Sequence, residues 1–172
     1  PVQLLWVNLV TDGLPATALS FNSADPENMT NPPRRKDEAI INGWTFLRYL
    51  IIGGYVGVAT VAGFVHWYLW YEGSPAISWS ELTSFHSCGS EGSTMPADFD
   101  CSIFSDARPC TVSLSILVTI EMLNALNSLS ENASLLTLPP WNNPTLCFAV
   151  ALSMALHFVL LYVPWIAAIF NV

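Results

Sequence analysis

The sequence is poor in charge, and above all in positive charge. Only 10% of its 172 residues are charged, whereas a typical soluble domain has about 25%. Five residues are Lys or Arg, which is too few to build the basic face that nucleic acid binding requires. Four cysteines in 172 residues are also too few for a small secreted domain held by disulfides.

Apolar residues, in contrast, are abundant. They make up 52% of the chain, and the mean hydropathy is +0.46. This apolar fraction excludes an intrinsically disordered chain. High hydropathy combined with little charge is typical of membrane proteins.

Four stretches are long and apolar enough to cross a bilayer, which takes roughly 20 residues. They cover about residues 2–21, 44–71, 111–129 and 145–163. We therefore predict an all-α, polytopic membrane helix bundle with about four spans. The first span begins at residue 2 without the basic flank of a signal peptide, so we expect the chain to be an internal piece of a longer protein.

The loops between these spans differ in charge. Loop 22–43 contains Arg34, Arg35 and Lys36, loop 72–110 contains six acidic residues and one arginine, and loop 130–144 is short. Because Lys and Arg near span ends favour the cytoplasm, we predict that loops 22–43 and 130–144 are cytoplasmic and that loop 72–110 lies outside. Cys88 and Cys101 lie in this outer loop, where they form a disulfide or remain two free thiols.

Two carboxylates fall in the middle of predicted spans: Asp12 in the first and Glu121 in the third. A carboxylate at the bilayer centre costs about 2.5–3.5 kcal/mol on insertion scales. No Lys or Arg lies in a span at a similar depth. The two acids are therefore protonated, paired with a helix outside this chain, or bound to cations.

Oxygen-bearing side chains and a predicted helix break surround the first of these acids. Asn8, Thr11 and Asp12 stand at i, i+3 and i+4, which places them on one helical face. Gly13 and Pro15 follow and predict an interrupted or unwound helix. Such a break frees backbone carbonyls that can bind an ion in the middle of the membrane.

A second polar stripe follows Glu121, with Asn124, Asn127 and Ser128 at i+3, i+6 and i+7. Carboxylate, amide and hydroxyl oxygens suit a hard cation such as Ca²⁺, and the absence of His and Cys from both stripes argues against zinc or copper. The stripes therefore predict an oxygen-lined cation site. The alternative is that these residues only form hydrogen bonds that pack the helices.

The second span contains two further patterns. Gly53 and Gly57 stand four residues apart, which either lets another helix approach closely or reflects the general enrichment of glycine in membrane helices. Near the end of the span lies an aromatic group that, with two rings after the fourth span, we predict to mark the outer membrane interface: Trp67, Tyr68, Trp70, Tyr71, Tyr162 and Trp165.

Several segments resemble the sarco/endoplasmic reticulum type calcium pumps, which are P-type ATPases. The run LLWVNLVTDGLPA over residues 4–16 resembles their sixth transmembrane helix. Further similarity lies within residues 31–34, 43–57, 118–132 and 139–141. The chain would thus correspond to the sixth to ninth helices of a ten-helix membrane domain, with loop 72–110 facing the lumen.

The resemblance implies that Asn8, Thr11, Asp12 and Glu121 are Ca²⁺ ligands. Asp12 would be shared by two ions, with Thr11 and Glu121 in one site and Asn8 in the other. The remaining ligands would come from the fourth and fifth helices. Thr11 together with Glu121 favours the endoplasmic reticulum type with two ions. The implied activity is ATP-driven transport of Ca²⁺ from the cytosol into the endoplasmic reticulum lumen, with proton counter-transport.

The resemblance also implies roles for residues outside the ion sites. Cys88 and Cys101 match a disulfide of the large lumenal loop. Asp25 and Glu27 match acids that contact the phosphorylation domain, and Phe46 matches a position in an inhibitor groove.

Further expectations concern partners. ATP and Mg²⁺ would bind domains absent from this chain, so the chain alone would catalyse nothing. The implied partners are the lipid bilayer, the remaining helices and cytoplasmic domains of the same pump, and small regulatory membrane peptides. The implied location is the endoplasmic or sarcoplasmic reticulum membrane. From the residues alone, a non-enzymatic membrane scaffold and a proton-coupled secondary cation transporter remain alternatives.

Overall fold

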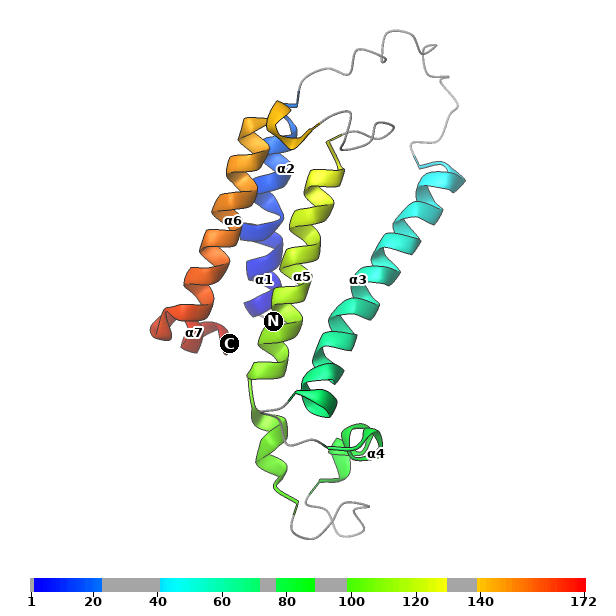
Figure 1. Ribbon diagram of the computed structural model, residues 1–172, viewed down its shortest axis with the longest axis vertical. Helices are drawn as coiled ribbons and strands as arrows, with labels where there is room; N and C mark the ends of the chain where they lie inside the picture. Colours follow the sequence, from blue (N-terminus) through cyan, green and yellow to red (C-terminus); the bar gives the residue numbers. More distant parts are fainter. Residues whose placement is uncertain (1, 23–40, 72–76, 89–98, 130–138) are drawn as a thin grey trace.

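A computed structural model describes residues 2–22, 41–71, 77–88, 99–129 and 139–172 of the chain. Figure 1 shows long helices lying alongside one another, and the described residues contain no strand. The predicted all-α fold class is thereby confirmed. Among the described residues, three helical stretches are long and apolar enough to cross a membrane: Gly43–Trp70, Cys101–Asn127 and Pro144–Tyr162.

The first apolar stretch is helical but divided. It consists of α1 (Val2–Trp6), a π-helical segment (Val7–Thr11) and α2 (Gly13–Leu19). The other long helices are α3 (Gly43–Trp70), α5 (Arg108–Asn127) and α6 (Pro144–Tyr162). Successive long segments run in opposite directions in Figure 1. We call the end where α2 and α5 finish the Asn22 end, and the opposite one the disulfide end.

The divided first segment packs with α5 and α6 into one unit, which we call the three-segment unit. Two apolar clusters fill it. Val7, Leu114, Val118, Met122 and Leu160 form one; Ala18, Leu129, Leu146 and Ala149 form the other. The short helix α7 (Pro164–Phe170) follows α6 and returns to α1, where the Gln3 amide donates a 3.2 Å hydrogen bond to the Phe170 carbonyl.

Helix α3 meets α5 over only part of its length, and diverges from it toward the Asn22 end in Figure 1. A β-carbon added at Gly63 would overlap the Cδ1 atom of Ile116, so the absence of a side chain permits this contact. Nothing lies within 4 Å of a β-carbon built at Gly53 or Gly57. Within the part of the chain described, close helix approach therefore occurs at Gly63 and not at the predicted pair.

The disulfide end has its own aromatic core. Trp67 and Tyr68 are only 6% and 2% exposed, and they pack with Ile77, Phe99 and Phe104. Folded protein thus covers these two members of the predicted aromatic group, whereas the other four, Trp70, Tyr71, Tyr162 and Trp165, are exposed.

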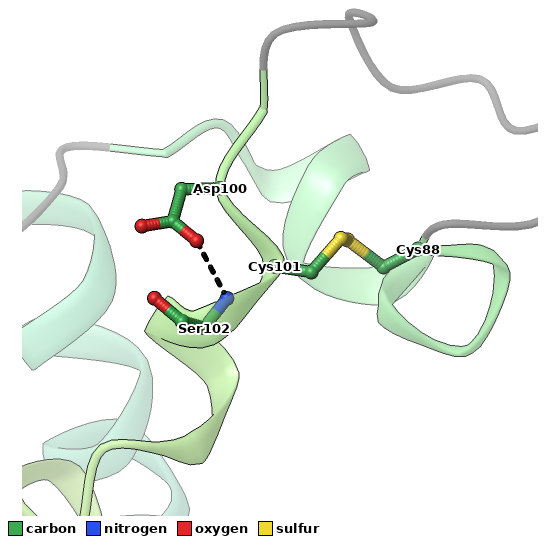
Figure 2. The surroundings of a disulfide bond; sticks show 4 residues. All are labelled: Cys88, Asp100, Cys101 and Ser102. Atoms are coloured by element: carbon green, nitrogen blue, oxygen red, sulfur yellow. Dashed lines mark hydrogen bonds between the residues drawn. A yellow bond between two sulfur atoms is a disulfide. The ribbon is translucent and has the colours of Figure 1, made fainter.

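Cys88 and Cys101 form a disulfide, as the resemblance implies, with their α-carbons 6.0 Å apart (Figure 2). The bridge joins the short segment after α4 (Trp79–Thr83) to the 3₁₀ turn Cys101–Ser105. Beside it, the Asp100 carboxylate accepts a 2.9 Å hydrogen bond from the Ser102 N–H. This bond stabilises the charged form and lowers the pKa of Asp100 below its usual 3.8.

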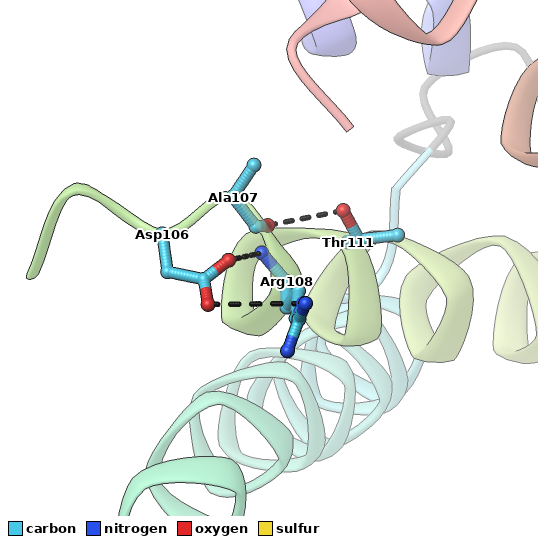
Figure 3. Close-up of polar contacts among 4 residues, drawn as sticks. All are labelled: Asp106, Ala107, Arg108 and Thr111. Atoms are coloured by element: carbon cyan, nitrogen blue, oxygen red, sulfur yellow. Dashed lines mark hydrogen bonds and ion pairs between the residues drawn. The ribbon is translucent and has the colours of Figure 1, made fainter. Parts of the chain in front are cut away.

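Local hydrogen bonds define where α5 begins (Figure 3). The Asp106 carboxylate accepts a 2.9 Å bond from the Arg108 N–H, one of the donors that a helix start leaves without an intrahelical acceptor. The Arg108 guanidinium also lies 3.8 Å from the same carboxylate. One turn on, the Thr111 hydroxyl donates to the Ala107 carbonyl at 3.0 Å.

Candidate cation site

The backbone widens just before Asp12. The Asp12 N–H donates a 3.0 Å bond to the carbonyl of Val7, five residues earlier, which is the spacing of a π-helical turn. Pro15 has no N–H to donate, so the carbonyl of Val10, five residues before it, receives no such bond. The hydroxyl of the fully buried Ser153 on α6 approaches that carbonyl at 3.5 Å, a long contact of the kind that compensates freed carbonyls in membrane helices.

The predicted interruption of the first span is therefore present, but its form and place differ from the prediction. It lies over Val7–Thr11, before Gly13 and Pro15, and the backbone remains helical instead of unwinding. The change of register turns Thr11 inward. Thr11 is fully buried, and its hydroxyl donates a 2.6 Å bond to the Val7 carbonyl.

Asp12 and Glu121 line the same cavity, although they lie on segments far apart in the sequence. The cavity has a volume of about 200 Å³. Its polar lining comes from Thr11, Asp12, Glu121, Asn124 and Ser128. Pro15, Ala16, Leu19, Met122 and Ala125 supply the rest. The structure thus brings together three of the four predicted ligands.

The charges and donors in this cavity suit a cation. No Lys, Arg or His lines it, and the two carboxylates repel one another when both are ionised. A hard divalent ion would neutralise both, and the neutral hydroxyl and amide oxygens are further ligands of the type that Ca²⁺ accepts. Within the described residues no cluster of three or more His, Cys, Asp or Glu could hold a metal, so these two acids would need oxygen ligands from elsewhere.

The other predicted site residues lie apart from this cavity. Asn8 is exposed on the π-helical segment and does not line it. Phe46 is 58% exposed near the start of α3. Asp25 and Glu27 lie outside the described residues.

Two asparagines that the sequence analysis did not single out join the helices at the Asn22 end. The Asn22 amide donates a 2.8 Å bond to the Leu129 carbonyl at the end of α5. The Asn143 amide is 2% exposed and donates a 3.3 Å bond to the Ala18 carbonyl, while its oxygen accepts the Leu146 N–H at 3.0 Å. Asn143 directly precedes Pro144, which is a signal for a helix N-cap, but its contact with α2 has no sequence signal.

The sequence of the chain is similar to those of known proteins. A family model described as "Cation transporting ATPase, C-terminus" matches residues 1–172. The chain is 52% identical over all 172 residues to calcium-transporting ATPase 3, endoplasmic reticulum-type, of Arabidopsis thaliana, and it spans 17% of that relative's length. The chain therefore belongs to the C-terminal family of the cation-transporting ATPases.

Proposed function

We propose that the chain is part of the membrane domain of an ATP-driven calcium pump that moves Ca²⁺ from the cytosol into the endoplasmic reticulum lumen. The observation that carries this proposal is the shared cavity of Asp12 and Glu121, which Thr11 also lines. The whole-chain similarity to an endoplasmic reticulum-type calcium-transporting ATPase supports the choice of ion and of compartment.

In this function the cavity residues bind the transported ion directly. Thr11, Asp12 and Glu121 would hold one Ca²⁺, and Asp12 would also contact a second ion that Asn8 binds from outside this cavity. Other helices of the pump would complete both coordination shells, because Ca²⁺ takes six to eight oxygen ligands. When the ions leave, two carboxylates in a low-dielectric cavity need another source of neutralisation, and protons from the lumen would supply it.

The rest of the pump would provide the energy. ATP and Mg²⁺ would bind its cytoplasmic domains, to which loops 22–43 and 130–144 would be closest, while loop 72–110 would face the lumen. Asp25 and Glu27 would contact the phosphorylation domain, and Phe46 would line an inhibitor groove. Lipid, the remaining helices and small regulatory membrane peptides would contact the apolar outer surface.

ATP-driven ⁴⁵Ca²⁺ uptake into vesicles that contain the full-length protein tests this proposal. We expect uptake by the unmodified protein and none by Asp12→Asn, because the amide keeps the size of the side chain but loses its charge. The matched control is Glu81→Gln on α4, since Gln preserves the capping box that Glu81 forms with Ser78.

Three results would contradict the proposal. High uptake by Asp12→Asn would exclude Asp12 as a ligand. Uptake driven by a pH gradient without ATP would instead favour a proton-coupled secondary transporter. No ion transport by any variant, with Glu121→Gln altering only assembly, would favour a scaffold.

A further inference from the structure

Two buried polar atoms of the three-segment unit have no hydrogen-bond partner among the described residues. They are the Nε1 atom of Trp6, on α1, and the Nδ1 atom of His157, on α6. Both residues lie within predicted spans, where leaving a buried polar group unpaired is costly. Neither residue lines the cavity of Asp12 and Glu121, so the proposed function gives these two atoms no role.

The contact between the first segment and α6 places Trp6 and His157 at the same level of the unit. The two segments run in opposite directions (Figure 1), and the Ser153 hydroxyl on α6 approaches the Val10 carbonyl on the first segment. His157 lies four residues after Ser153, and Trp6 lies four residues before Val10. Because four residues make about one helical turn, both residues are displaced from that contact toward the disulfide end by similar amounts.

The Trp6 ring lies beside the end of α6 that carries His157. Its centroid is 5.2 Å from that of the Phe170 ring, with an angle of 73° between the two planes. Phe170 belongs to α7, which directly follows α6. Trp6 and Phe170 also pack against the same buried cluster, which includes Leu160 of α6.

The other ring nitrogen of His157 already has a partner, because Nε2 lies 3.1 Å from the Ser115 Oγ atom on α5. If Nε2 donates in this bond, Nδ1 is an acceptor; if the Ser115 hydroxyl donates, Nδ1 carries the proton and needs an acceptor. The indole N–H of Trp6 is a donor only, so it suits Nδ1 in just one of these two tautomers. A water molecule both donates and accepts, and it therefore satisfies Nδ1 and the indole N–H in either tautomer.

We propose that one ordered water molecule is bound between Trp6 Nε1 and His157 Nδ1 and joins the first segment to α6. Buried waters typically make about three hydrogen bonds to polar groups that otherwise have no partner, and such a bridge is nearly as favourable as a direct hydrogen bond. The bridge adds to the contacts that Asn143 and Ser153 of the α6 region make with carbonyls of the first segment. It is independent of the proposed function, because it involves neither carboxylate.

A structure of the full-length protein, at a resolution that shows ordered water, tests this inference directly. We expect a water molecule within about 2.7–3.2 Å of both nitrogen atoms. The inference is overturned if Trp6 Nε1 and His157 Nδ1 bond to each other, or if no water lies within hydrogen-bonding distance of both.

Two substitutions test the bridge through stability. Trp6→Phe keeps an aromatic ring beside Phe170 but loses the N–H, and His157→Gln keeps a polar atom at the reach of Nε2 but removes Nδ1. Alone, Trp6→Phe should raise the rate of thermal unfolding of the full-length protein about three- to tenfold, since a hydrogen bond is lost. In the His157→Gln background the same change should alter that rate by less than about twofold, because the bridge is already absent.

Trp165→Phe on α7 is the matched control. This indole is 68% exposed, so its loss should leave the unfolding rate within about twofold. The inference is overturned if Trp6→Phe has no larger effect than Trp165→Phe, or if its effect is equal in the two backgrounds. If a variant does not accumulate in the membrane, the search for the water in the unmodified protein decides.

Discussion

The three-segment unit and helix α3 differ in how they are held in the molecule. In the unit, side chains bond to backbone carbonyls of a neighbouring helix: Asn22 and Asn143 at one end, and Ser153 in the middle. Helix α3 also takes part in a bond of this kind, which the Ser113 hydroxyl of α5 donates to the Thr60 carbonyl at 2.9 Å, but its close approach to α5 depends on the absence of a side chain at Gly63, where Ile116 packs.

The difference is related to the two carboxylates, because only the three-segment unit carries Asp12 and Glu121. The π-helical segment and the helix ends leave carbonyls without intrahelical partners, and bonds to these groups fix α2, α5 and α6 in one register. That register sets the separation of Asp12 and Glu121. Helix α3 contributes no residue to their cavity, so its contacts can change without altering the carboxylate pair.

The largest effect on stability should come from the disulfide end. Cys88→Ser opens a bridge between residues 13 positions apart, which should cost about 3 kcal/mol by the loop-closure estimate. In the full-length protein, Cys88→Ser should lower the temperature at which this end unfolds. Cys110→Ser, at a free exposed thiol, should leave that temperature unchanged. Calcium affinity should stay the same, and a large loss of affinity would contradict the separation of the two regions.

The next largest loss of stability should come from a substitution at the contact between α3 and α5. Gly63→Val introduces overpacking against Ile116, for which about 1–3 kcal/mol is expected. The matched control is Gly57→Val, because nothing lies within 4 Å of a β-carbon there. Thermal stability should fall only for the first, and Ile116→Ala should partly restore it. An equal loss of thermal stability for Gly63→Val and Gly57→Val would show that Gly63 is not the point of close contact between α3 and α5.

Removing a polar contact of the three-segment unit should cost less stability than the two changes above, but it should affect the ion site more. Asn143→Ala removes both a helix cap and the bond to the Ala18 carbonyl, at a cost of about 1–2 kcal/mol. Because α2 loses a contact that fixes its register, the calcium concentration for half-maximal uptake should rise. The exposed neighbour Asn142 serves as the control, and Asn142→Ala should leave uptake unchanged. A drop in stability without any change in calcium affinity would show that this contact does not position the ion site.

The smallest expected effect is on thermal stability at low pH, and it depends on Asp100. The pKa of Asp100 is lowered in the folded state by the Ser102 N–H, so its stabilising contribution is full above the usual pKa of 3.8 and is lost as the pH falls through the lower folded value. The fully exposed position keeps this contribution small. Asp100→Asn retains an oxygen acceptor that does not titrate. Between pH 5 and about 2, its thermal stability should therefore fall slightly less than that of the unmodified protein, and an equal fall would refute the role of this group.

Much of the three-segment unit could be predicted because its signals are local. Long apolar runs predict the helices, and the cost of burying a charge identifies Asp12 and Glu121 without any knowledge of their neighbours. Thr11 follows from its helical spacing to Asp12. Whether the two acids share a cavity depends on how the distant segments pack, and only the similarity to a known family predicted it.

The remaining features depend on partners that local sequence does not specify. Asn22 and Asn143 bond to backbone carbonyls, which every residue has, so no particular residue type signals these contacts. The spacing of Gly53 and Gly57 indicates a face that permits close approach, but not which face meets α5, and Gly63 does so instead. The π-helical segment lies before Pro15, where the Ser153 hydroxyl of another helix approaches the Val10 carbonyl, a contact between distant segments.

Equilibrium ⁴⁵Ca²⁺ binding to the purified full-length pump, without ATP, tests most directly whether Asp12 and Glu121 bind the transported ion together. We predict that Asp12→Asn abolishes high-affinity binding, since Asp12 serves both ions, and that Glu121→Gln loses the ion held in the shared cavity. If both variants bind as many ions as the unmodified pump with the same affinity, the cavity is not the calcium site.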